Sequence, residues 1–90
     1  MKVAFTETAL AKVEEIFAYV AAQNPPAADR IVARIEQVIS RIGEFPHMGH
    51  SVDEPDVRIV PVGRFPYLIF YAVTDVVTIL HVRHAARLRP

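Results

Sequence analysis

The stretch VRIVPVGRFPYLIFYAVTDVVTILHV, residues 57–82, decides the fold of this chain of 90 residues. Branched and aromatic apolar residues dominate it and fall into three runs with the length and composition of β-strands: 57–62, 67–72 and 76–82. Turn-forming residues, among them Gly63, Pro66 and Asp75, separate the runs. The stretch therefore predicts an antiparallel meander of three strands.

The sequence before the meander predicts a short strand and two helices. Lys2–Phe5 alternates polar and apolar residues like an edge strand, and Thr6 is a suitable N-cap for the helix that follows. Apolar residues then recur at helical spacing along two stretches: Leu10, Val13, Phe17 and Val20, then Ala28, Ile31, Ile35, Val38 and Ile42. Asn24-Pro25-Pro26 is expected to turn the chain into the second helix, and Gly43 is expected to end it.

These elements predict one α+β domain over residues 1–90, with a short N-terminal strand, an antiparallel helical hairpin and a three-strand antiparallel meander that forms one small sheet. Residues 44–56 show no periodicity and contain two prolines and a glycine, so we expect a loop that crosses from the helices to the sheet. Hydrophobic residues make up 52% of the chain and charged residues 22%. Because a lone domain of this size needs fewer apolar residues, we expect a partner to cover part of its surface.

Composition narrows the possible classes of protein. The chain has no cysteine, which excludes disulfides and thiolate metal sites and is compatible with a reducing cytosol. The N-terminus lacks the apolar segment of a signal peptide, and no apolar run approaches the 18 or so residues of a membrane span. We therefore expect a cytoplasmic protein with no membrane contact.

The net charge of zero conceals two halves of opposite sign. Residues 1–56 hold nine acids and five bases, a net charge of −4. Residues 57–90 hold five arginines against Asp75 alone, a net charge of +4. Arginine suits planar, bidentate recognition of carboxylate or phosphate, so the predicted sheet is the half expected to meet an anionic partner.

The whole chain resembles the RelE/ParE superfamily of bacterial type II toxins. The order of elements is that of the family, and so is a series of residues along them: Ala9, Ile16, Asn24-Pro25, Ala28, Arg30, Phe45-Pro46, Gly49, Arg58, Tyr67, Tyr71, Ile79-Leu80, Val82, His84 and Arg87. The resemblance implies a toxin that forms a hetero-oligomer with a cognate antitoxin. It also implies one of two targets, since the ParE branch inhibits DNA gyrase and the RelE branch cleaves messenger RNA on the ribosome.

The leading interpretation is a ParE-like toxin that binds DNA gyrase and is neutralised by a ParD-like antitoxin. The alternative is an enzyme, a RelE-like ribosome-dependent endoribonuclease. Cleavage of RNA through its own 2′-hydroxyl needs a base, an acid and cations. The candidates for proton transfer are only His81, His84, Tyr67 and Tyr71, and no Lys follows Lys12, so binding is favoured over catalysis. A toxin that has lost its activity would show the same pattern.

Alternation along the last strand assigns its residues to faces. Side chains two apart share a face and those three apart do not. His81 and Arg83 are therefore expected on one face, and His84 on the other with Leu80 and Val82. If the strand is regular, His81 and His84 lie on opposite faces and cannot bind the same metal ion.

Other common sites are missing from the pattern. His47 and His50 lie close together in the loop without a well-placed third ligand, and the three glycines are too scattered for a phosphate-binding loop. We therefore predict neither a metal nor a cofactor.

Two surfaces are predicted from the resemblance together with the charge pattern. Toxicity is expected at the end of the last strand, in Arg83, His84 and Arg87, with Arg58 and Arg64 as further candidates. The helical stripes are wider than a three-strand sheet can cover, so the antitoxin is expected to bind at six apolar positions: Leu10, Val13, Phe17, Ile31, Ile35 and Val38.

Overall fold

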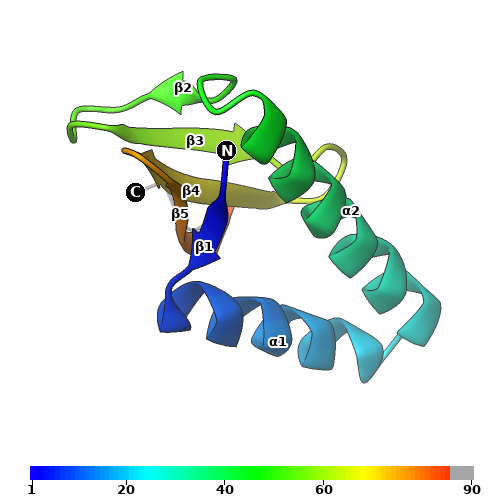
Figure 1. Ribbon diagram of the computed structural model, residues 1–90. Coiled ribbons are helices and arrows are strands. Elements are labelled where there is room, and N and C mark those ends of the chain that lie inside the picture. Colours follow the sequence, from blue (N-terminus) through cyan, green and yellow to red (C-terminus); the bar gives the residue numbers. More distant parts are fainter. Residues whose placement is uncertain (86–90) are drawn as a thin grey trace.

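The computed structural model describes residues 1–85 and confirms the α+β prediction, with two helices against one mixed sheet (Figure 1). Its elements follow in this order: β1 (Val3–Phe5), α1 (Glu7–Ala21), α2 (Pro25–Glu44), β2 (His50–Ser51), β3 (Val57–Pro61), β4 (Tyr67–Val73) and β5 (Val77–His84). In these residues, neither helix is long and apolar enough to cross a membrane.

The sheet has five strands in the order β1-β5-β4-β3-β2. The predicted meander supplies the three antiparallel central strands, and β1 joins at the edge parallel to β5, with Val3 opposite Val77. Strand β2 was not predicted, because it is only two residues long and lies within the stretch 44–56 that has no periodicity. It pairs antiparallel with β3, with His50 opposite Ile59.

The core lies between the helices and one face of the sheet. In α2 the predicted stripe is buried throughout, at Ala28, Ile31, Ile35, Val38 and Ile42. Val62 joins the core from the residue after β3, and seven residues come from the strands: Val60, Tyr67, Ile69, Tyr71, Val77, Ile79 and Val82. Helix α1 contributes Ala9 and Ile16, whereas two residues of its predicted stripe stay exposed, Leu10 at 49% and Phe17 at 41%. The face of α1 that packs on the core is thus rotated away from these two residues.

The structure confirms the predicted N-terminal ends of both helices, and the C-terminal end of α2 lies one residue later than predicted. The side chains of Thr6 and Asn24 accept hydrogen bonds from the backbone N–H of Ala9 and Ala27 and cap α1 and α2. Gly43 does not end α2, which continues to Glu44. A side chain at position 43 would come within 3.2 Å of the Val3 side chain, so this glycine lets the N-terminal strand approach the helix closely.

Strand β5 contains a bulge at Leu80. Phe70 pairs with His81 and its neighbour Tyr71 with Ile79, so Leu80 has no partner on β4. Because of this extra residue, the core face of β5 carries Ile79 and then Val82, three positions apart. The prediction that Leu80 shares a face with Val82 is therefore wrong, and Leu80 is only half-buried.

Thr6 holds this bulge from the other edge of β5. Its backbone N–H donates to the Ile79 carbonyl at 3.0 Å, and its hydroxyl donates to the Leu80 carbonyl at 2.7 Å. The same hydroxyl oxygen accepts the capping bond at the start of α1. A single threonine therefore fixes both the start of the first helix and the irregularity in the last strand.

The crossing loop is fastened to the sheet by Tyr71, whose side chain is fully buried. The Tyr71 hydroxyl donates to the Pro46 carbonyl at 2.7 Å and accepts from the Gly49 N–H at 3.0 Å. Arg58 adds two bonds from Nη1, to the carbonyls of His47 and Gly49. A side chain at position 49 would overlap the Ile59 carbonyl, so only glycine permits this close approach.

The bulge generates a prediction about two neighbouring residues. Replacing the fully buried Ile79 by Ala should lower the free energy of unfolding by about 2–5 kcal/mol, because it leaves a cavity in the core. Replacing Leu80 by Ala should cost only about 1 kcal/mol. Urea denaturation of the two variants measures both values, and equal losses would contradict the assignment of faces.

The loop attachment generates a second prediction. Tyr71→Phe leaves the buried Gly49 N–H and the half-buried Pro46 carbonyl without this partner, and should cost about 1–3 kcal/mol of unfolding free energy. Tyr19→Phe is the matched control, since that side chain is 70% exposed, and should change nothing measurable.

The cost of Tyr71→Phe should also depend on pH. Burial raises the pKa of the Tyr71 hydroxyl, although the Gly49 N–H and the charge of Arg58 partly oppose this. The stabilisation is therefore fully present below the unfolded pKa of about 10 and is lost as the pH rises through the folded-state pKa. Denaturation of wild type and variant at pH values on both sides of 10 checks this, and a difference that grows above pH 10 would contradict it.

Candidate functional site

The outer face of the sheet, opposite the helices, carries a cluster at the end of β5. His81 and Arg83 lie on this face, as predicted, beside Phe70 of β4. The His81 ring meets the Phe70 ring edge-on at 4.4 Å between centroids, and the Arg83 guanidinium lies 5.3 Å from the same ring centre. Phe70 thus orders an imidazole and a cation side by side.

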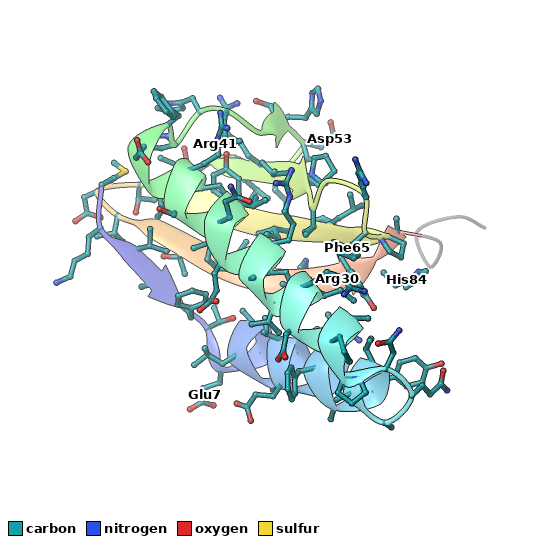
Figure 2. The ribbon with its side chains drawn as sticks, turned by 90° about the vertical axis from the view of Figure 1, so that its right-hand side faces the viewer. Glu7, Arg30, Arg41, Asp53, Phe65 and His84 are labelled. Carbon is teal, nitrogen blue, oxygen red and sulfur yellow. The ribbon has the colours of Figure 1, made fainter. Side chains whose placement is uncertain are left out.

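Acidic residues reach this cluster from the crossing loop. Asp53 and Glu54 line an open cleft of about 340 Å³ together with the three clustered side chains and with Val52, Val57 and Leu80. Asp53 lies just beyond the end of β2 (Figure 2). The cleft therefore combines two carboxylates, an imidazole and a guanidinium over an apolar floor.

The environment of His81 favours its neutral form. Burial lowers the pKa of the imidazole and the charge of Arg83 lowers it further, while Glu54 acts in the opposite direction. Its Nε2 atom is buried without a hydrogen-bond partner among residues 1–85. A neutral imidazole in this position can accept a proton or a hydrogen bond.

His84 lies on the inner face, as the alternation predicts. Its ring meets that of Tyr67 edge-on at 5.4 Å, at the end of β5 (Figure 2). His84 and Arg83 also line a larger cleft, of about 620 Å³, between β5 and the side of α1 that carries Lys12 and Glu15. Two of the predicted toxicity residues are thus brought together at one edge, and the third, Arg87, lies outside the described residues.

The other two toxicity candidates lie elsewhere. Arg58 pairs with Tyr71 on the inner face and holds the crossing loop, so its guanidinium is engaged in the fold. Arg64 is exposed in the turn between β3 and β4. Neither lines the cleft that contains Arg83.

The six positions predicted for antitoxin binding divide into two groups. Ile31, Ile35 and Val38 are at most 6% exposed and belong to the core of the domain, so they offer no surface to a partner. Leu10 and Phe17 are exposed and Val13 is half-buried. The apolar surface left open on the helices is therefore a stripe along α1.

Sequence reasoning missed Glu54 and Phe70 as members of the site. Glu54 lies in a stretch without periodicity, and Phe70 appears in the sequence as one more apolar strand residue. Only the pairing of β4 with β5 and the path of the loop bring them to His81. Tyr67 and Tyr71 are buried and form part of the core, and residues 1–85 contain no group of three side chains able to ligate a metal.

Comparisons with known proteins agree with this fold. A protein of Sinorhizobium fredii named "Putative toxin Y4kP" is 34% identical over 93% of this chain and 88% of its own length. "Toxin RelE2" of Caulobacter vibrioides is 35% identical over 97% of this chain and 98% of its own. The chromosomal ParDE toxin–antitoxin structure from P. aeruginosa superposes with a TM-score of 0.81 at 20% identity, over 93% of this chain and 95% of that chain.

The family match covers nearly the whole chain. Residues 3–89 match the family described as "ParE toxin of type II toxin-antitoxin system, parDE". This range includes both helices, the five strands and the outer-face cluster. The protein described here belongs to the ParE toxin family.

Proposed function

We propose that this toxin arrests growth by binding DNA gyrase through the end of β5, and that a cognate ParD-like antitoxin neutralises it in a hetero-oligomer. The proposal is supported by the family match and by one feature of the site. Arg83 is exposed, is ordered by Phe70, and has no carboxylate within ion-pair distance among residues 1–85. Its guanidinium is therefore available for a bidentate contact with a partner.

The proposed mechanism is binding without a cofactor. The ring of Phe70 restricts the motion of the Arg83 side chain, so less conformational entropy is lost when a partner carboxylate or phosphate is engaged. His84 lies beside Arg83 at the large cleft. The Arg83 guanidinium would make the cationic contact at this end of the sheet, and Arg87 remains a candidate from its position in the sequence.

A ribosome-dependent endoribonuclease is the second candidate, because the outer-face cleft assembles Glu54, His81 and Arg83. In that reaction neutral His81 would take the proton of the 2′-hydroxyl, and the oxygen would attack the adjacent phosphorus. The bond to the 5′-oxygen would break and that oxygen would take a proton from water, while Arg83 would stabilise the charge on phosphorus. The name of the Caulobacter relative, Toxin RelE2, is consistent with this candidate.

We assign antitoxin binding to the exposed stripe on α1. Leu10 and Phe17 are seven residues apart and thus share one face of the helix, with Val13 between them. Exposed apolar side chains at this spacing suit an amphipathic partner segment, which would gain about 25 cal/mol for each Å² of apolar area buried.

Expression without antitoxin distinguishes the two targets. Gyrase inhibition should produce filamentous cells with an SOS response, whereas a ribosome-dependent nuclease should stop translation and truncate messages.

Arg83→Ala combined with Arg87→Ala should abolish arrest and leave antitoxin affinity within about tenfold. His81→Gln removes the proposed base, so it should leave a gyrase inhibitor active and inactivate a nuclease. Arrest that survives the double substitution at normal protein levels would place the active surface elsewhere, such as Arg64.

The antitoxin surface is tested by Leu10→Gln combined with Phe17→Gln. Both side chains are exposed, so the stability of the toxin should change by no more than about 0.5 kcal/mol per substitution. The affinity for the cognate antitoxin should fall at least tenfold, or about 1.4 kcal/mol, in isothermal titration calorimetry. Tyr19→Gln, on the opposite side of α1, is the control and should have little effect. An unchanged affinity of the double variant would remove α1 from the interface.

A further inference from the structure

Helix α2 carries a stripe of arginines that neither proposed surface uses. Arg30, Arg34, Gln37 and Arg41 follow one another at spacings of 4, 3 and 4 residues, which places them on one face of the helix. All four are exposed, and Figure 2 shows Arg30 and Arg41 toward opposite ends of α2. We call this set the α2 arginine stripe.

The stripe borders a groove at the edge of the sheet. A cleft of about 320 Å³ lies between α2 and β3, and four residues of α2 line one side of it: Arg34, Gln37, Val38 and Arg41. The other side is formed by residues of the crossing loop and of β3: Met48, Gly49, His50, Ile59, Val60, Pro61 and Gly63. The groove thus has two guanidinium groups, an amide and an imidazole beside an apolar wall, and no carboxylate lines it.

The geometry of Arg34 shows that this side chain is ordered. Its Nη1 donates to the Gln37 side chain at 2.8 Å. Its guanidinium also lies so close to Gly63 that a Cβ there would come within 2.7 Å of Nε. Gly63 has a φ of +53°, a left-handed conformation that glycine adopts readily. The turn between β3 and β4 therefore leaves room for the arginine at the mouth of the groove.

The positive charge of the groove is not neutralised within the domain. Across residues 1–85, no carboxylate lies within ion-pair distance of Arg30, Arg34 or Arg41. Of the acids in the same helix, Asp29 and Glu36 are offset from the stripe by the helical repeat. Glu44 follows Arg41 by three residues at the end of α2, and it makes no ion pair with the stripe among residues 1–85. An anion that binds here can therefore form charge-assisted hydrogen bonds with these arginines, which stabilise the complex.

The backbone at this edge does not suit an added peptide strand. Strand β2 is only two residues long, the Gly49 N–H before it is already bonded to Tyr71, and Pro61 of β3 has no N–H to donate. Short edge strands and proline are features that prevent strand addition. The side chains, and not the backbone, are left to recognise a partner.

We propose that the groove between the α2 arginine stripe and β3 binds the phosphodiester backbone of a nucleic acid. Arg34 and Arg41 would each contact a phosphate, and the exposed side chain of Met48 would face the sugars or bases. The contact is independent of sequence because it involves the backbone. It does not depend on gyrase being the target, since it uses a different surface from that of Arg83.

Fluorescence anisotropy with the full-length toxin tests the proposal. The probes are labelled single-stranded DNA and RNA of the same sequence, each about 12 nucleotides long, and a labelled poly-glutamate peptide. Wild-type toxin should bind nucleic acid with an affinity that falls as salt rises. Arg34→Gln combined with Arg41→Gln should weaken binding at least tenfold and reduce the slope of log K against log salt by about 1.4.

Two controls keep the outcome clear. Lys2→Gln combined with Lys12→Gln removes the same net charge elsewhere and should leave binding within about twofold. Arg41→Gln alone, with circular dichroism melting to confirm folding, separates lost contacts from lost structure. A preference for DNA or for RNA would identify the source of the phosphates. Absence of binding at low salt, equal weakening by the lysine variant, or tighter binding of poly-glutamate would each overturn the proposal.

Discussion

The bulge at Leu80 is the constraint on which the rest of the structure depends. In a regular strand, His81 and Arg83 would share a face with Val77 and Ile79, which are fully buried. Burial of a guanidinium without a paired carboxylate would cost far more than the apolar contacts return. The extra residue, held by Thr6, turns the second half of β5 by one position. One strand can therefore fill the core with its first half and present charged groups with its second.

Much of the fold could be predicted because its signals are local. The helix caps at Thr6 and Asn24, the apolar spacing of α2 and the turns of the meander each depend on neighbours in the sequence. The prediction that His81 and Arg83 share one face and His84 lies on the other was also correct. All three residues follow the bulge, and β5 alternates regularly there. The same alternation gave the wrong face for Leu80, because a bulge depends on the pairing between two strands and leaves no signal in one strand's sequence. Strand β2 was missed because its two residues are likewise recognised only by their pairing with β3.

The functional surfaces were harder to predict than the fold. The charge difference between the two halves of the sequence does not correspond to an acidic and a basic surface in the folded protein. Asp53 and Glu54 of the acidic half line one cleft together with Arg83. Arg34 and Arg41, also of the acidic half, line a basic groove. Helical spacing likewise identifies an apolar stripe without showing what covers it. Ile31 and Ile35 are buried in the core, whereas Leu10 is exposed.

The parallel pairing of β1 with β5 has a consequence for the time at which the protein folds. Val3 pairs with Val77 and Phe5 with Ile79, and the N-terminal amine bonds to the Gly43 carbonyl. The chain must therefore be synthesised at least as far as β5 before β1 can join the sheet, and contacts so far apart in sequence form slowly. Until β5 is in place, β1 has no strand to pair with, and the bond from Thr6 that holds the bulge cannot form.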